Sequence, residues 1–323
     1  MLKLGGAFMK KIQRSVVWAI LAAALYALNS PASKLLLSRV ESAMMAALLY
    51  LGAGGGMFLL GLFQRKNGKR QEERLTRREM PYTVGMILLD IAAPILLMMG
   101  LKRCAAANVS LLNNFEIVAT TLLAFLFFKE KISPRLLGAI GLITLASILL
   151  SIEDASSFQF SEGSVFVLLA CVCWGLENNC TRMMSAKDPM EIVVIKGFGS
   201  GTGSLLVAFL TGEQLPELPW IPVVLLLGFV AYGLSIFFYV YAQRSLGAAR
   251  TSTYYAVSPF IGAALSAIFL REKLSGLFPA ALLVMIAGTI LVTLDEQGIS
   301  VRKQLRGLLQ RFRRRPEEAP KVL

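Results

Sequence analysis

LAFLFFKEKIS, at residues 123–133, and LSAIFLREKLS, at residues 265–275, are two copies of one pattern within the same chain. They align position by position without a gap. A second pair lies upstream of them, because SVVWAILAAALYALNSPASKLL at 15–36 aligns with SVFVLLACVCWGLENNCTRMM at 164–184 after a one-residue slip. The chain therefore contains two copies of one structural unit.

The composition is that of an integral membrane protein. Of the 323 residues, 56% are hydrophobic and only 16% are charged, and the mean hydropathy is +0.64. This leaves too little polar surface for a water-soluble globule. A spanning helix needs about 20 mostly apolar residues, and ten runs of the chain satisfy that requirement. They are 15–37, 41–63, 80–101, 105–128, 134–152, 163–184, 190–211, 219–242, 247–270 and 276–294.

Each copy contains five runs, and this odd number of crossings places the second copy upside down in the membrane. The predicted fold is an all-α integral membrane protein with ten transmembrane helices, arranged as two inverted five-helix repeats around a central cavity. The first run also resembles a signal peptide, but its removal would break the repeat, so we predict a helix. Met9 is an alternative initiator to Met1. The expected parts are a cytoplasmic tail at 1–14, a first repeat at 15–152, an external linker at 153–162, a second repeat at 163–296 and a basic cytoplasmic tail at 297–323.

The net charge of +13 is concentrated on one side of the predicted membrane. With the N-terminus inside, 26 of the 33 Lys and Arg residues lie in tails and loops that face the cytoplasm, as the positive-inside rule requires. This predicts a plasma-membrane protein with both termini in the cytoplasm and explains the charge without a nucleic-acid partner. The basic loop at 64–78 and the tail at 302–315 would face anionic lipids of the inner leaflet. We expect the tail to be either an amphipathic surface helix or a solvated, disordered segment.

The residue types that are missing narrow the possible chemistry. The chain has no His, which is the commonest metal ligand, so any proton coupling must use carboxylates. The four Cys residues lie inside or directly beside apolar runs, where we expect them to pack. Without His or a cluster of metal ligands, we predict no metal and no cofactor. No Ser or Cys nucleophile lies beside a base, so we predict no enzyme activity. The Gly-rich stretches at 52–56 and 197–203 lie inside apolar runs, where they favour close helix packing over nucleotide binding.

Polar side chains nevertheless occupy the middle of several runs. A carboxylate at the membrane centre costs about 2.5 to 3.5 kcal/mol, so these side chains should face one another or water. In the run 105–128, Asn113, Glu116 and Thr120 share one helix face. We therefore predict a cavity between the repeats. Its deep polar residues are Asn29, Asp90, Asn113, Asn114, Glu116, Glu177, Asn178 and Asn179.

The second copy contributes rings and hydroxyls to the same cavity. Tyr232, Tyr255 and Ser258 occupy the positions that align with Asp90, Asn113 and Glu116. Aromatic faces hold apolar or cationic groups. The aromatic side of the predicted cavity consists of Tyr26, Trp174, Tyr232, Tyr254 and Tyr255.

Ten helices in two inverted halves, with FKEKIS and LREKLS closing the fourth and ninth runs and WG in the sixth, resemble the EamA family of the drug/metabolite transporter superfamily. The resemblance covers residues 15–296. It implies a secondary transporter or facilitator of small metabolites, with a central cavity lined by the first, third, fourth, sixth, eighth and ninth helices. The family often has a Pro midway along the fourth helix. Here Pro259 is kept in the ninth run, whereas Glu116 and Ile117 occupy the matching place in the fourth.

Asp90 and Glu116 are the strongest candidates for binding. Both lie near the middle of their runs, and we expect no Lys or Arg at their depth in the neighbouring polar helices. A buried acid without a basic partner favours a cation, a proton, or both, as its counterion. Glu177 is a third candidate for proton coupling. Lys196 is expected either to snorkel or to neutralise Glu177.

Other polar residues have structural alternatives. Lys34 and Arg182, which align with each other, are expected to snorkel near helix ends. Glu130 and Glu272 lie among basic residues, where pairing or capping is expected. Three of the deep amides, Asn29, Asn178 and Asn179, are expected either to bond across helices or to bind substrate.

The sequence thus predicts a secondary active transporter that moves a small amphipathic amine, amino acid or organic cation by alternating access, with proton coupling. Alternatives are a proton-coupled exporter of hydrophobic drugs and a non-transporting membrane subunit. The expected partners are the substrate, protons and membrane lipids, in a monomer or homodimer. Proton coupling is assigned to Glu116, Asp90 and Glu177. The predicted substrate-binding residues are Asn29, Asp90, Asn113, Glu116, Trp174, Glu177, Asn178, Tyr232, Tyr255 and Ser258.

Overall fold

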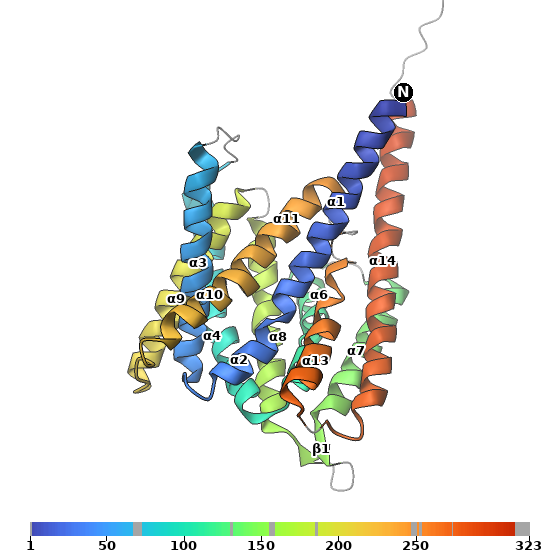
Figure 1. The fold of residues 1–323 in the computed structure, drawn as a ribbon. Helices are drawn as coiled ribbons and strands as arrows, with labels where there is room; N and C mark the ends of the chain where they lie inside the picture. Colours follow the sequence, from blue (N-terminus) through green and yellow to red (C-terminus); the bar gives the residue numbers. More distant parts are fainter. Residues whose placement is uncertain are drawn as a thin grey trace, which may run out of the picture.

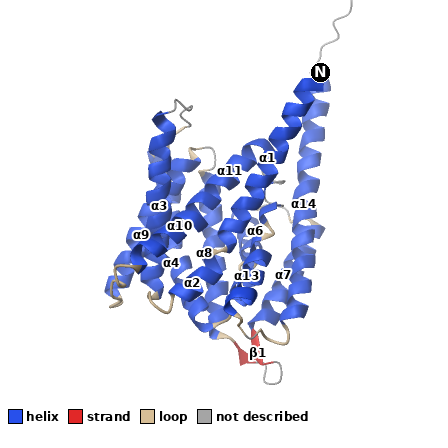
Figure 2. Cartoon of the chain, viewed as in Figure 1, coloured by secondary structure: helices blue, strands red, loops and turns tan. Residues whose placement is uncertain are grey.

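The computed structural model describes residues 2–66, 73–129, 132–154, 159–184, 187–246, 251, 254–272 and 274–313. Helices make up nearly all of this part of the chain (Figure 2). A short antiparallel pair, β1 (Ile152–Asp154) with β2 (Gln159–Phe160), joins the two halves. Nine described stretches are long and apolar enough to span a membrane, and Ser258–Leu270 is a shorter apolar helix. The predicted all-α membrane fold is confirmed.

Residues 15–152 are called the first half below. Its elements begin with a long N-terminal helix that is interrupted once, and they end at the strand pair. In chain order they are α1 (Leu2–Ala27), α2 (Asn29–Leu36), α3 (Ser42–Lys66), the 3₁₀-helix η1 (Arg77–Glu79), α4 (Met80–Arg103), α5 (Ala106–Leu112), α6 (Phe115–Phe128) and α7 (Pro134–Ser151).

Residues 163–296 are called the second half. Its eighth predicted span contains a π-helical segment, which is a feature often found at functional sites. In chain order the elements are α8 (Glu162–Met183), α9 (Pro189–Leu210), α10 (Trp220–Gly228), the π-helix η2 (Phe229–Leu234), α11 (Ser235–Leu246), α13 (Ser258–Leu270) and α14 (Phe278–Arg313).

Besides the run 15–37, which is interrupted at Leu28, two predicted spans are broken near their middle. The run 105–128 forms α5 and α6 with a turn at Asn113–Asn114, where the Asn114 amide donates to Leu111 O at 3.2 Å. The ninth run turns just before Ser258, next to Pro259, which has no N–H for a helical bond. Residues 247–250 and 252–253 of that run lie outside the described part. Such breaks place helix ends and polar backbone groups inside the membrane, which is tolerated only where they face protein or a cavity.

The helix pairs reveal the relation between the halves. α3 packs along α9, and α7 packs along α14, so each of these pairs joins equivalent helices of the two repeats. α4 packs along α8, so the third helix of the first half meets the first helix of the second half. α1 packs along α11, which is the corresponding contact with the two halves exchanged. α7 and α14 run in opposite directions (Figure 1). This is the arrangement expected of inverted repeats.

Close approach of α3 and α9 depends on glycine. A Cβ atom added at Gly197 would lie 2.4 Å from Gly54 Cα, and one added at Gly54 would lie 2.9 Å from the Gly197 carbonyl carbon. A side chain at either position would force the helices apart. The prediction that the Gly-rich stretches serve helix packing is confirmed at this contact.

The bundle has two distinct ends (Figure 1). The start of α1 and the end of α14 lie at one end, the termini end, and β1 lies at the other, the hairpin end. α1 already begins at Leu2, and α14 continues to Arg313, so both helices extend beyond the predicted spans into the segments expected to be tails. As far as Arg313, the structure favours the helical alternative for the C-terminal tail over the disordered one.

Candidate functional site

A buried ion cluster lies where α3, α4, α8 and α9 meet. The Lys196 ammonium on α9 is 3.1 Å from Asp90 Oδ2 and 3.1 Å from Glu177 Oε1. The Tyr50 hydroxyl donates to Asp90 Oδ1 at 3.0 Å, and the Thr181 hydroxyl donates to Glu177. The side chains of Asp90 and Glu177 are 0% and 2% exposed. One ammonium therefore bridges two carboxylates that are shielded from solvent.

This cluster corrects one prediction. Asp90 was expected to lack a basic partner, but Lys196 reaches it from α9, a helix in which no deep acid or amide was found. The expectation that Lys196 neutralises Glu177 is confirmed. Lys196 was visible in the sequence, but the rotation of α9 that brings it to Asp90 was not.

A second cluster surrounds Glu116, which lies in the first turn of α6. The Asn178 amide donates to Glu116 Oε1 at 2.6 Å and to Thr120 Oγ1 at 3.3 Å. Glu116 and Thr120 therefore share a helix face, as their spacing predicted. No Lys or Arg of the described residues forms an ion pair with Glu116. The N-terminus of α6 supplies a partial positive charge that favours the carboxylate.

α8 joins the two clusters into one site. Glu177 faces Lys196 and α4, whereas the next residue, Asn178, faces Glu116 on α6. Consecutive helical positions point about 100° apart, so a single turn of α8 serves both clusters. The joint site contains three carboxylates and one ammonium. Two negative charges remain for protons or a bound cation when every acid is ionised.

Tyrosine rings from both halves form an aromatic group beside these acids. The Tyr26 ring lies 5.8 Å from the Tyr232 ring and 5.9 Å from the Tyr255 ring, and the Tyr50 and Tyr232 rings are 5.4 Å apart, between centroids. The Asn29 amide donates to the Tyr232 hydroxyl at 3.0 Å. The predicted aromatic residues Tyr26, Tyr232 and Tyr255 are thus brought together, and Tyr50 joins them although the sequence did not single it out.

The remaining predicted residues differ in their surroundings. The Ser258 hydroxyl donates to Ala23 O at 2.8 Å, which ties α13 to α1. Trp174 packs in the hydrophobic core and is 6% exposed. Asn113 Oδ1 is buried at the turn between α5 and α6, without a hydrogen-bond partner among the described residues. Tyr254 is half-buried.

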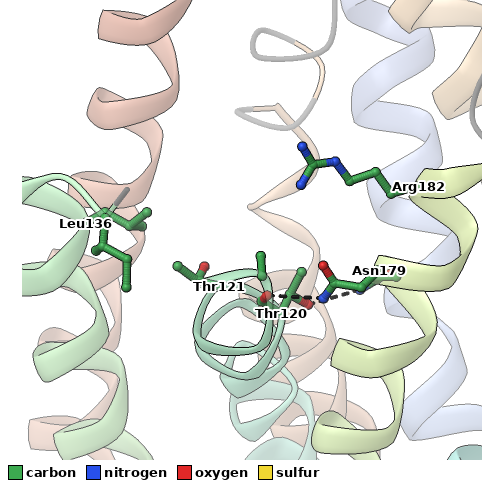
Figure 3. A pocket seen from close by; sticks show the side chains of 8 residues that line it. Thr120, Thr121, Leu136, Asn179 and Arg182 are labelled. Carbon is green, nitrogen blue, oxygen red and sulfur yellow. Dashed lines mark hydrogen bonds between the residues drawn. The ribbon is translucent and has the colours of Figure 1, made fainter. Parts of the chain in front are cut away.

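A cavity of about 190 Å³ lies next to Thr120 and Asn178, between the Glu116 cluster and the termini end. Figure 3 shows Leu136 of α7 across from Thr120 and Thr121 of α6, with Asn179 and Arg182 on α8. One wall is polar and the other is apolar. Of the predicted substrate-binding residues, Asn178 lines this cavity, whereas Glu116 is not among the lining residues and is linked to the cavity through its hydrogen bond from Asn178. The lining residues are Thr120, Thr121, Ala124, Ile132, Leu136, Asn178, Asn179 and Arg182.

Comparisons with known proteins agree with this architecture. A family model described as the EamA-like transporter family matches residues 13–152 and 161–294. An uncharacterized transporter of Methanothermobacter thermautotrophicus is 26% identical over 306 residues, which cover 89% of this chain and 88% of the relative. An uncharacterized solute carrier family 35 member of Schizosaccharomyces pombe is 23% identical over 136 residues, covering 40% of this chain and 27% of the relative. One crystal structure has a similar fold, with a TM-score of 0.63 at 16% identity, over 88% of this chain and 97% of that one.

Proposed function

Because the chain belongs to the EamA-like transporter family, we propose that it moves a small amphipathic metabolite that carries a positive charge, such as an amine, an amino acid or an organic cation. The protein is a multi-pass membrane transporter of the drug/metabolite transporter superfamily and not an enzyme, and its substrate is a small molecule. The charge of that substrate, the coupling to protons and the transport mechanism are the parts proposed here.

The carboxylate of Glu116, which forms no ion pair with a Lys or Arg in the described part of the chain, is the observation that carries the proposal. Its hydrogen-bond partner is the neutral amide of Asn178, and Asn178 lines the cavity. A carboxylate inside a membrane needs a counterion, which can be a proton or the cationic group of a ligand. The tyrosine group supplies ring faces that attract a cation or an apolar chain. Tyr232 and Tyr255 belong to this group, and Asn29 donates a hydrogen bond to Tyr232. The Ser258 hydroxyl donates to Ala23 O of α1.

Proton coupling follows from the same carboxylate. A proton and a substrate cation compete for Glu116, so binding of one releases the other, and exchange across the membrane couples their movements. Asp90 and Glu177 share Lys196 in this structure, and each takes part in coupling when Lys196 shifts towards the other. The broken helices α5–α6 and the inverted halves suit alternating access around this fixed site.

The orientation in the cell is also proposed. The excess of Lys and Arg in the tails and loops at the termini end supports a plasma-membrane protein with both termini in the cytoplasm. The cavity beside Glu116 would then open towards the cytoplasm, and the hairpin end would face outside.

A ligand screen of the purified protein tests the substrate class. Apparent melting temperatures in detergent are measured with amines, zwitterionic amino acids, organic anions and neutral drugs at two pH values. A bound ligand stabilises the folded state by RT ln(1 + [L]/Kd), which is about 2.7 kcal/mol at 100 times Kd. We expect stabilisation by cations or zwitterions, and its loss in Glu116→Gln. Glu217→Gln, at an exposed position between α9 and α10, is the matched control and should keep the response.

Export of hydrophobic drugs is the second candidate, because Ala124, Ile132 and Leu136 give the cavity an apolar wall. In that case the carboxylates carry protons only. Stabilisation by neutral apolar drugs that persists in Glu116→Gln would support drug export and contradict the proposed cationic substrate.

A further inference from the structure

The hairpin end of the site is sealed by packed helices. Every residue of α5 is buried, with exposed fractions from 0% to 9%. α13 lies tightly against α5, because a Cβ atom added at Gly262 would be 2.9 Å from Ser110 Oγ and 3.2 Å from Ala27 O. The cavity beside Glu116 lies on the opposite side, towards Arg182 at the far end of α8. The structure is therefore closed at the hairpin end.

A cluster of charges and helix ends lies at this seal. The Lys34 ammonium donates to the carbonyls of Leu101 and Cys104, the latter at 2.8 Å, where α4 ends. The backbone N–H of Ala106, the first residue of α5, donates to Glu272 Oε2 at 2.7 Å. Glu272 Oε1 is 3.9 Å from Lys34 Nζ. The two charged side chains are 24% and 18% exposed, so both are largely withdrawn from solvent.

The chemistry of this cluster is complementary. Lys34 lies at the negative end of the α4 dipole, and Glu272 lies at the positive end of α5. The N-cap residue of α5, Ala105, makes no side-chain capping hydrogen bond to the helix. The Glu272 carboxylate of the other half caps α5 instead, by accepting from the backbone N–H of Ala106. Lys34, Leu101, Cys104 and Ala106 all belong to the first half, whereas Glu272 belongs to the second. Glu272 is thus the member that must separate when the halves part.

We propose that Glu272 is a latch that holds the hairpin end shut. Opening this end breaks the bonds of Glu272 to Ala106 and Lys34, while Lys34 keeps its two carbonyl partners within the first half. Lys34 was expected to snorkel and instead sits in this cluster, and the expected capping by Glu272 is directed across the repeat boundary. The repeat counterpart of Lys34, Arg182, lines the cavity towards the termini end, so one of the two aligned basic residues lies on each side of the site. The latch rests on the alternating access proposed above.

A buried reporter on α5 tests the latch without any substrate. Ser110 is 3% exposed and faces Gly262, so Ser110→Cys should react slowly with a water-soluble maleimide while the end is closed. The reporter is placed in a chain whose four native cysteines are replaced by Ser or Ala. Alkylation is followed by mass in detergent-purified protein. We expect Glu272→Ala to raise the alkylation rate about tenfold, since a hydrogen bond to a charged group is lost, and Glu272→Gln to raise it less.

Glu213 offers a matched control. Glu213 also belongs to the second half and caps a first-half helix, since it accepts from Ala43 N at 3.1 Å and from Met44 N at 2.7 Å at the start of α3. Because α3 packs along α9, we expect this contact to persist when the hairpin end opens. Glu213→Ala should leave the rate unchanged. An unchanged rate in folded Glu272→Ala, or an equal rise in Glu213→Ala, would overturn the latch. Because no ligand is involved, neither result bears on the binding role of Glu116, which the ligand screen tests separately.

Discussion

At the scale of single residues, the fold depends on the charge balance around Lys196. Removing one partner of a buried ion pair leaves an uncompensated charge, which destabilises a protein by about 3 to 5 kcal/mol. We expect Lys196→Met to lose stability in this range, because Asp90 and Glu177 then face each other without the ammonium. The measurement is the apparent melting temperature and the yield of folded protein in detergent.

A double variant separates charge from packing in that result. Asp90→Asn combined with Lys196→Met removes one acid along with the ammonium, so it should be more stable than Lys196→Met alone. A double variant that is less stable than the single one would show that the hydrocarbon stem of Lys196 matters more than its charge.

The sequence predicted which residue types would gather at the site, but not every contact. Helical spacing predicted that Glu116 and Thr120 share a face, and both accept hydrogen bonds from Asn178. The partner of Asp90 was predicted wrongly, because pairing depends on how α9 is rotated against α4, which hydropathy does not encode. Tyr50 was not singled out because its run, 41–63, carries no acid or amide near its middle.

At the scale of elements, the α3–α9 contact is one of the close links between the halves. Gly197→Val should destabilise the protein by at least about 1 to 3 kcal/mol, the usual effect of overpacking. The added atoms would meet backbone atoms of Gly54 and Tyr50, which cannot move aside as the end of a flexible side chain can. Gly55→Ala is the matched control, since a Cβ atom there meets nothing within 4 Å. Equal melting temperatures for the two variants would contradict this account of the contact.

The helix breaks mark the limit of prediction from hydropathy. A two-residue turn at Asn113–Asn114 barely changes the apolar content of the run 105–128, so the run was predicted as one helix. The repeat alignment contained a stronger signal. α6 and α13 end at aligned residues, Lys129 and Arg271, which adopt the same left-handed conformation with φ of 52° and 50°. Equivalent sequence therefore ends equivalent helices in the same way.

At the scale of the whole molecule, the inverted repeat explains how one chain surrounds a site. Exchange of the two halves turns the α4–α8 pair into the α1–α11 pair and leaves α3–α9 and α7–α14 unchanged. The sequence predicted this symmetry because the odd number of helices in each copy requires inversion. It did not predict which end would be closed, since both ends carry related sequence.

The asymmetry of the halves gives the site its chemistry. The first half contributes Asp90 and Glu116, and the aligned positions of the second half contribute Tyr232 and Ser258. The second half also contributes Glu177 on α8 and Lys196 on α9. The side chains that meet between the halves therefore form an acidic part and an aromatic part, and these two parts suit the proposed substrate with a cationic and an apolar group.

Counter-transport in proteoliposomes tests the central claim most directly. The permanently charged cation or the zwitterion that most stabilises the protein is added outside vesicles that contain a pH-sensitive dye. If Glu116 exchanges this substrate for protons, the wild-type protein will couple substrate uptake to proton release from the vesicles, and Glu116→Gln will abolish the pH change while remaining folded. Equal substrate-driven pH changes in both proteins would contradict the assignment of Glu116 as the site of exchange.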